Sequence, residues 1–173
     1  HIRTDGGAPL RAELREGQVD LALDYFPVGD AGFSSTCVIT ETLMTLSRRD
    51  HPLLGERLSL EQYVALSHVV LRAPSNQRPM IDLALAKRGL QRRIAVWVPR
   101  FISMPLIVQA SDMIGTLPRR MATLYADHFR LKAFPVPLRV PQFPVYLIWH
   151  ESLEPDAGHR WFRQHLIDFC QRL

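Results

Sequence analysis

The sequence predicts an α/β fold with mostly parallel sheets, and three observations lead to this fold class. Apolar runs of strand length alternate with amphipathic stretches of helical spacing along the whole chain. Glycine or proline marks many of the boundaries between them, as at Gly17, Gly89 and Pro118. Two extended runs, residues 37–47 and 135–144, look like crossings between subdomains. A chain that leaves one sheet and later returns to it would build two lobes that share a cleft.

The composition is that of a globular protein, with 47% hydrophobic and 22% charged residues. A chain of 173 residues can bury one good core or two small ones. No apolar run is long enough to span a bilayer, and the start does not read as a signal peptide, so no membrane partner is expected. The chain opens at His1, inside the strand-like HIRT and without an initiator methionine, so we expect a piece of a longer protein.

The net charge of +4 comes from 21 basic and 17 acidic residues. The cations are scattered in pairs and form no dense stripe, which argues against direct contact between this fragment and DNA. These pairs are Arg48–Arg49, Arg92–Arg93 and Arg119–Arg120. The two cysteines, Cys37 and Cys170, lie far apart and match no metal-ligand spacing. Two free thiols favour a reducing compartment, so the sequence points to a cytoplasmic protein.

The first half of the chain carries the clearest helix signals. Ser59 and Gln62 form a capping box, in which each side chain accepts a hydrogen bond from the backbone of the other. Gly17 suits the position just beyond a helix. The expected elements are a strand over residues 1–4, a helix over 10–17, a strand over 19–25, one long extended run over 37–47, a helix over 60–66 and a strand over 68–71.

The second half continues the alternation. Ser103 is expected to cap a helix that is apolar nearly all round and therefore buried. The expected elements are a helix over 79–88, strands over 94–98 and 112–117, a helix over 119–128, strands over 131–134 and 145–149, and a last helix that starts at Pro155. This last helix carries apolar side chains at helical spacing, which we assign to the core, although part of the set could instead meet a partner protomer. They are Trp161, Phe162, His165, Leu166, Phe169 and Leu173.

Several stretches resemble the regulatory domain of LysR-type transcriptional regulators, and the resemblance covers nearly all of the chain. These stretches are VDLALDYFP (19–27), RRDHPL (48–53), SLEQYVALSHVVL (59–71), LAKRGL (85–90), VPRFISMPLIVQASDMIGTLPRRMA (98–122), YLIWHE (146–151) and HRWFRQHL (159–166). None of them is decisive alone, but their order is fairly specific. The sequence looks closest to the branch that contains nodulation and aromatic-degradation activators.

The resemblance implies two Rossmann-like lobes of the type 2 periplasmic-binding-protein kind, with a small organic effector held between them. Lobe I would be residues 1–46 plus 144–173, lacking its first strand and helix, and lobe II would be residues 47–143. The resemblance also implies a dimer, or a tetramer in the full-length parent. DNA binding would belong to an N-terminal winged helix-turn-helix that this chain lacks.

The candidate effector-binding residues follow strand ends. Asn76, Gln77 and Arg78 precede one helix, whereas Arg100, Phe101, Ser103 and Met104 precede or open another. An arginine can hold a carboxylate bidentately, and helix N-termini favour anions, so these residues suit an anionic or aromatic effector with Phe101 against its apolar body. A solvated loop and an ordinary helix cap explain the same residues, and Arg100 could equally point into solvent.

Three aromatic residues at other strand ends complete the candidate set. Tyr25 and Phe26 end an early strand where lobe I residues would face the cleft, and core packing explains them equally well. Trp149 ends the strand that returns to lobe I. All three are candidates for effector contact.

Two candidate positions depart from the pattern of the family's aromatic-acid sensors. Those members carry Thr-Gly-His where this chain has Asn76-Gln77-Arg78, and Pro-His-Phe where it has Pro99-Arg100-Phe101. The resemblance therefore carries over the place of the site, while the changed side chains argue against a salicylate-type effector.

Catalysis is not expected. The sequence has no GxSxG elbow, HExxH motif, glycine-rich phosphate loop or cysteine pair with metal spacing, so we predict no catalytic residue, metal or cofactor. The alternative binding function is a solute-binding protein that delivers its ligand to a transporter, since the same fold serves both. A helix-turn-helix or a secretory signal in the parent reading frame would separate these two hypotheses.

Overall fold

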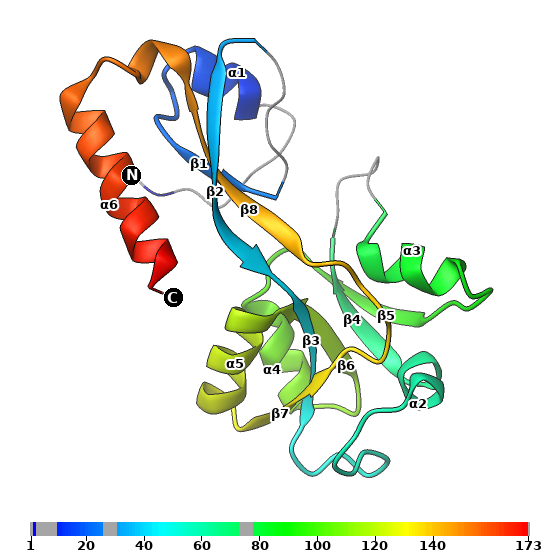
Figure 1. Cartoon of the computed structure of the whole chain (residues 1–173). Coiled ribbons are helices and arrows are strands. Elements are labelled where there is room, and N and C mark those ends of the chain that lie inside the picture. The colour runs from blue at the N-terminus through cyan, green and yellow to red at the C-terminus, as the bar shows by residue number, and fades with distance from the viewer. Residues whose placement is uncertain (1, 3–9, 26–30, 73–77, 173) are drawn as a thin grey trace. The chain divides into compact units, whose positions relative to one another are not determined.

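In the computed structural model, residues 2, 10–25, 31–72 and 78–172 are described. The chain divides into two compact units (Figure 1). Unit 1 consists of His1–Glu41 and Phe143–Leu173, and unit 2 consists of Thr42–Gln142. These units are defined by internal packing, so the regulatory lobes divided after residues 46 and 143 stay a prediction.

Unit 1 is built around one central strand. Its elements are α1 (Leu10–Arg15), β1 (Ala22–Asp24), β2 (Phe33–Glu41), β8 (Phe143–His150), the short 3-10 helix η1 (Glu151–Leu153) and α6 (Ala157–Gln171). The sheet has the order β1-β8-β2, and β8 pairs antiparallel with both neighbours. Two chain segments more than a hundred residues apart thus form one sheet.

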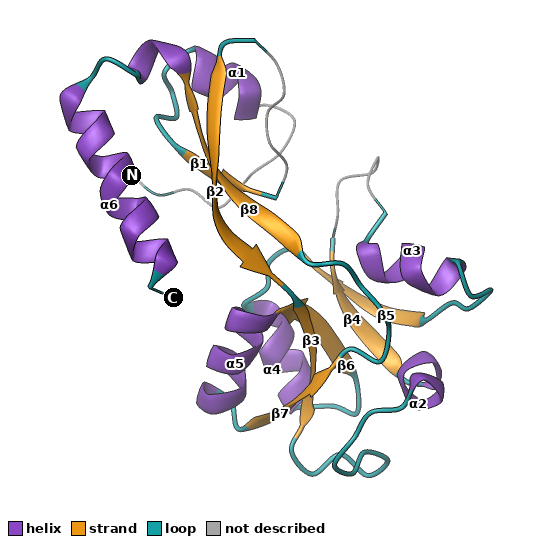
Figure 2. Cartoon of the chain, in the orientation of Figure 1, coloured by secondary structure: helices purple, strands orange, loops and turns teal. Residues whose placement is uncertain are grey.

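Unit 2 holds a five-stranded sheet of order β5-β4-β6-β3-β7 with helices on both faces (Figure 2). Its elements are β3 (Leu43–Arg48), α2 (Leu60–Ala65), β4 (Ser67–Leu71), α3 (Met80–Ala86), β5 (Arg93–Val98), α4 (Ser103–Gln109), β6 (Ile114–Pro118), α5 (Arg119–His128) and β7 (Leu131–Pro135). One core cluster joins the sheet to α4 and α5, and the other joins it to α2 and α3.

The prediction of mostly parallel sheets was wrong, because both sheets contain antiparallel pairs. Among the described residues, β4 pairs in parallel with β5 and β6, whereas β3 runs antiparallel to β6 and β7. The expected single strand over residues 37–47 is two strands in different sheets, with Thr42 between them. Two neighbouring parallel strands must be joined by a crossover connection, which is usually a helix. The strands that carry the chain from one unit to the other are joined without such a helix.

The last helix buries a different face from the predicted one. Its buried or half-buried side chains that face the sheet are Arg163, Leu166, Ile167 and Cys170. Of the predicted core residues, only Leu166 belongs to this face. Trp161, Phe162 and Phe169 are 68%, 47% and 51% exposed, so their assignment to the core of this chain was wrong. His165 is also exposed and stacks on Trp161, while Leu173 lies outside the described residues.

Helix starts were predicted with mixed success. The capping box of α2 is confirmed, since Gln62 N–H donates to Ser59 Oγ at 3.2 Å and Ser59 N–H donates to Gln62 Oε1 at 2.9 Å. Ser103 is not a cap but the first residue of α4, and Ile102 at the cap position makes no side-chain cap bond. Leu106 is 56% exposed, so α4 is not buried all round as predicted. The expected strand over residues 1–4 falls mostly outside the described residues.

A glycine in β6 lets α4 approach the sheet closely. A Cβ atom added to Gly115 would lie 2.5 Å from Met104 Sδ and 3.3 Å from Val108 Cγ2. Met104 and Val108 are fully buried, so neither side chain has free space to move into.

We expect Gly115→Ala to destabilise unit 2 by about 1–3 kcal/mol, because the added methyl group overpacks the core. Urea unfolding measures the loss, and Gly55→Ala is the matched control, since a Cβ at Gly55 meets no atom within 4 Å. In a Met104→Ala background the cost of Gly115→Ala should shrink, because the clash partner is gone. An equal cost in both backgrounds would contradict the packing argument.

Candidate functional site

The candidate site lies where two neighbouring parallel strands of unit 2 end. Leu71, the last residue of β4, is the register partner of Val98, the last residue of β5. The next residue of the chain, Arg72, donates its backbone N–H to the carbonyl of Val98 at 2.8 Å. Segments that follow these two strands therefore leave from the same edge of the sheet, which is where open α/β sheets bind ligands.

Three arginine side chains belong to these segments. Arg72, Arg78 and Arg100 are exposed, and none forms an ion pair within the described part of the chain. Arg78 and Arg100 were predicted from the sequence. Arg72 was missed, although its place directly after a parallel strand was a usable signal. Asn76 and Gln77 lie outside the described residues.

Around the start of α4, the structure separates the predicted residues by burial. Phe101 is half-buried and packs against the core cluster below α4 and α5. Met104 is fully buried, so its side chain fills the core and only its backbone is near the candidate site. Ser103 is half-buried.

The backbone at this corner offers few free donors. Ser103 N–H donates to the carbonyl of Arg100 at 3.2 Å, and Met104 N–H donates to that of Phe101 at 3.0 Å. Helices α3 and α4 have seven residues each, so few aligned peptide dipoles act at their N-termini. An anion at this edge would therefore depend on the arginine side chains more than on the helix ends.

The other predicted residues belong to unit 1, so the structure gives no common geometry for them and the arginines. Tyr25 is 38% exposed, and its ring packs edge-on against Phe143 at 5.3 Å between centroids. Burial, and secondly the charge of Asp24, raise the pKa of the Tyr25 hydroxyl above its usual value, so this side chain is a neutral donor. Phe26 lies outside the described residues.

Trp149 already has partners for its polar atom and its ring. Its exposed fraction is 8%, and its indole Nε1–H donates to Glu154 Oε1 at 2.8 Å. The guanidinium carbon of Arg163 lies 4.6 Å from the ring centroid. A ligand at Trp149 would have to displace or extend this arrangement.

The arrangement of unit 2 is suited to binding. Exposed guanidinium groups beside a half-buried aromatic ring can hold an anionic group and an apolar body together. Across residues 2, 10–25, 31–72 and 78–172, no group of three His, Cys, Asp or Glu side chains is placed to hold a metal ion. None of the helices in those ranges has the length and apolarity that crossing a bilayer requires.

Comparison with protein families identifies the domain. The sequence profile described as the LysR substrate binding domain matches residues 1–171. The chain belongs to this family. The family assignment confirms the resemblance seen in the sequence and makes the chain a binding domain of transcriptional regulators, without enzymatic activity.

Curated relatives agree with this assignment. The chain is 30% identical over 164 residues to the HTH-type transcriptional activator NahR of Pseudomonas putida, which covers 95% of the chain and 55% of NahR. It is 31% identical over 159 residues to the HTH-type transcriptional activator NagR of a Ralstonia species, covering 92% of the chain and 53% of NagR. This LysR-family chain thus spans about half the length of these relatives.

Solved structures show the same fold. A putative transcriptional regulator from Vibrio parahaemolyticus matches with a TM-score of 0.83 and 25% identity, over 95% of this chain and 76% of that one. A probable transcriptional regulator from Pseudomonas aeruginosa matches with a TM-score of 0.78 and 27% identity, over 90% and 51%. The effector-binding domain of QuiR, solved in complex with shikimate, matches with a TM-score of 0.76 at 18% identity, over 96% and 79%, and shows the fold alone.

Proposed function

We propose that this LysR-family domain senses a small organic anion with an apolar or aromatic body, and that Arg72, Arg78 and Arg100 hold its anionic group. Phe101 would contact the apolar body. Tyr25 remains a further candidate for contact with the inducer. The parent protein would use the change on binding to regulate transcription.

The observation that carries this proposal is that Arg72 and Arg100 follow two neighbouring strand ends. These two arginines, and Arg78 before α3, have no acidic partner among the described residues. An arginine that is not already paired can form a charge-assisted, bidentate hydrogen-bond pair with a carboxylate and gives up no internal ion pair. A match to QuiR, a protein of this fold solved with the carboxylic acid shikimate, is consistent with this ligand class.

The signal would pass through the oligomer of the parent protein. Since curated relatives are about twice as long as this chain, we infer that a DNA-binding part accompanies the domain in a dimer or tetramer. An inducer can shift the oligomer between two arrangements only by its difference in affinity for them. Membership of the LysR family sets aside the alternative of a transporter's solute-binding protein.

We expect Arg100→Ala, and separately Arg78→Ala, to raise the inducer concentration for half-maximal response about ten-fold, since each removes a charge-assisted hydrogen-bond partner. The measurement is a dose-response curve of a reporter gene under the full-length parent regulator. Arg57→Ala is the control, because Arg57 is an exposed arginine of the same unit that forms no ion pair with another described residue.

Uninduced expression should stay the same in all three variants. Dose-response curves that coincide with the wild type for Arg78→Ala, Arg100→Ala and the double variant would remove these arginines from the site.

A further inference from the structure

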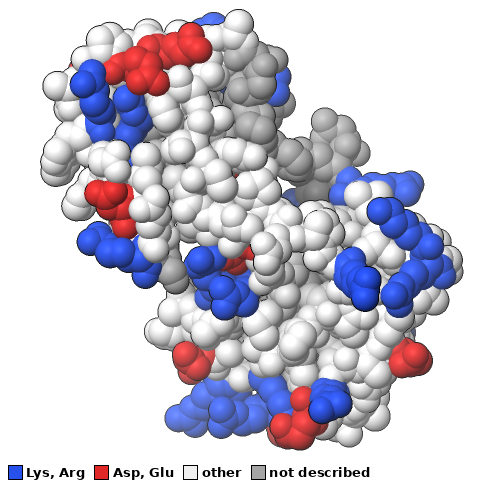
Figure 3. Space-filling view, in the orientation of Figure 1, with Lys and Arg blue, Asp and Glu red and all other residues white. Residues whose placement is uncertain are grey.

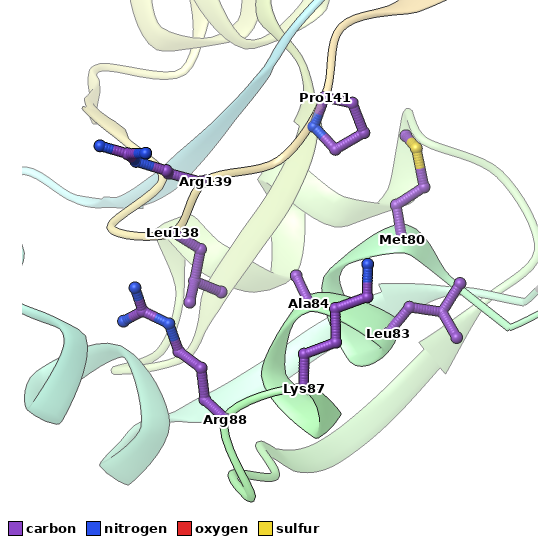
Figure 4. Close-up of a pocket in the computed structure, with 8 residues that line it drawn as sticks. All are labelled: Met80, Leu83, Ala84, Lys87, Arg88, Leu138, Arg139 and Pro141. Carbon is purple, nitrogen blue, oxygen red and sulfur yellow. The ribbon is translucent and has the colours of Figure 1, made fainter.

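A pocket of about 240 Å³ lies on unit 2 between α3 and the segment that follows β7 (Figure 4). The α3 side is lined by Met80, Leu83, Ala84, Lys87 and Arg88. The opposite wall consists of Leu138, Arg139 and Pro141. The pocket thus combines an apolar floor with three cationic side chains from two segments about fifty residues apart.

The wall formed by residues 136–141 is held in place by three apolar side chains. Val136, Leu138 and Val140 are half-buried and pack against the core cluster of α2 and α3. Arg139 and Pro141 of the same segment are exposed. Leu138 serves both sides, because it packs into the core and also lines the pocket.

The helical wall is fixed in the same way. Ile81 and Leu85 bury one face of α3, so Leu83 and Lys87 face outward. Beyond the helix, Gly89 has a φ of +68°, and Leu90 N–H donates to the carbonyl of Leu85 at 3.0 Å. This C-terminal turn holds the backbone of the cations in a defined place.

The cations of the pocket have no acidic partner. Lys87, Arg88 and Arg139 form no ion pair in the described ranges, and the carboxylate of Asp82 on the same helix is bound to Arg92 at 2.6 Å. Figure 3 shows basic side chains crowded over this side of unit 2, at the right of the view, with no acidic side chain between them. The pocket is therefore a local concentration of positive charge.

A helix C-terminus favours cations by itself, which accounts for Lys87 and Arg88 without any ligand. It does not account for the pocket's other features. Arg139 comes from a different segment, and Leu83 is 46% exposed at the pocket although water is a poor environment for leucine.

We propose that this pocket binds a small organic monoanion with an apolar body, such as an aromatic carboxylate. The volume lies just below the usual range for drug-sized ligands, which limits the ligand to a small one. A flat, wholly charged surface would suit the phosphates of DNA better, whereas this pocket has an apolar floor in a hollow. The inference stands apart from the proposed inducer site and does not depend on it.

The three cations should contribute unequally. In Figure 4 the guanidinium of Arg88 extends alongside Leu138, whereas that of Arg139 points away from Met80 and Leu83. Arg139 would have to change its side-chain torsions to meet a ligand, which costs conformational entropy. Arg88 should therefore contribute more than Arg139 to the affinity of the pocket for an anion.

Titration of the isotope-labelled chain with benzoate, followed by amide NMR, tests the proposal. Amides of residues 83–88 and 138–140 should shift and saturate together, and uncharged benzamide at equal concentration should shift them much less. Arg88→Ala should weaken benzoate binding at these amides roughly two- to five-fold, and Arg139→Ala less. Arg57→Ala, at an exposed site outside the pocket, should leave binding unchanged.

Each alternative has its own outcome. Equal shifts with benzamide would overturn the charge argument, and no saturable shift with benzoate would overturn the site. Shifts of the same amides with a short DNA duplex, but not with benzoate, would assign the surface to phosphate groups instead. Arg100→Ala should leave the pocket shifts unchanged, so failure of the inducer site and failure of this pocket can be told apart.

Discussion

Replacing Arg163 by methionine should destabilise unit 1 by about 2–3 kcal/mol, because a buried, hydrogen-bonded guanidinium is lost. Arg163 is 6% exposed, although it lies in the middle of a helix. Its guanidinium donates to Glu154 Oε2 at 3.0 Å and to the carbonyl of Leu153 at 3.1 Å. Glu154 is half-exposed and regains water when the arginine is removed, so the expected cost lies below that of a fully buried pair.

A histidine of α6 completes the surroundings of Arg163. Arg163 donates to His159 Nδ1, while His159 Nε2–H donates to the carbonyl of Asp20 at 3.1 Å. The two bonds require the tautomer with its proton on Nε2. Arg163 thereby links α6 to the loop before β1 as well as to the ring of Trp149.

The fluorescence of Trp149 reports the unfolding of unit 1 and therefore measures the loss of stability. Substituting Trp97 and Trp161 by phenylalanine leaves Trp149 as the single tryptophan, which Arg163 contacts directly. Urea unfolding of Arg163→Met in this background should show the full loss. Arg160→Met is the control, because Arg160 is exposed on the same helix and makes one hydrogen bond to the carbonyl of Glu154. Equal losses from the two substitutions would refute a special role for Arg163.

Arg163 also explains why the sequence predicted the wrong buried face for α6. Hydrophobic spacing favours the aromatic set that includes Trp161 and Phe169, whereas the helix turns the face of Arg163 and Cys170 to the sheet. An arginine is expected on the surface, and three of the groups that Arg163 contacts, Leu153, Glu154 and Trp149, precede α6 and stabilise its buried guanidinium. Those partners lie outside the helix, so helical periodicity alone cannot reveal them.

Local signals predicted the order and positions of most elements well. The capping residues Ser59 and Gln62, and Gly89 beyond α3, mark boundaries through interactions within a few residues. Strand direction and sheet membership depend on distant partners, and a run such as 37–47 reads the same whether it enters one sheet or two. The break at Thr42 therefore could not be predicted from the pattern.

In the candidate site, too, local features could be predicted from the sequence, whereas contacts between distant residues could not. Arg78 and Arg100 could be predicted as candidates because they lie near expected helix starts, which is a local feature. The burial of Met104 depends on Gly115 across the sheet, and the pocket beside α3 needs Arg139 from a separate segment. Both are contacts between residues far apart in the sequence, which only the folded structure brings together.

Acidification should destabilise unit 2 through His68, which is fully buried in β4. Its Nε2–H donates to the carbonyl of Tyr63 at 2.7 Å, and the Tyr63 ring meets it edge-on at 4.7 Å. Its Nδ1 atom meets no hydrogen-bond partner within the described residues. Protonation would therefore place a charge and an unpaired N–H in the core.

Burial is the largest cause of a pKa for His68 of about 4, well below the ordinary 6.5. The charge of Arg92 lowers this pKa further, whereas the hydrogen bond to Tyr63 and the charge of Asp82 oppose the shift. Between pH 6.5 and 4 the unfolded chain binds more protons at this residue than the folded chain. The contribution of neutral His68 to the free energy of unfolding is therefore fully present above pH 6.5. It falls by about 3 kcal/mol as the pH drops to 4, and below pH 4 the loss levels off.

His68→Gln isolates this contribution, because the glutamine amide can donate to the carbonyl of Tyr63 and does not titrate in this range. Urea unfolding at pH 7 and at pH 4.5, followed by the circular dichroism of the backbone, gives the pH-dependent loss for each protein. The wild type should lose about 2–3 kcal/mol more than His68→Gln across this interval, since other titrating groups act equally in both. Equal losses would mean that His68 accepts a proton in the folded core as readily as in the unfolded chain, contrary to its unpaired Nδ1.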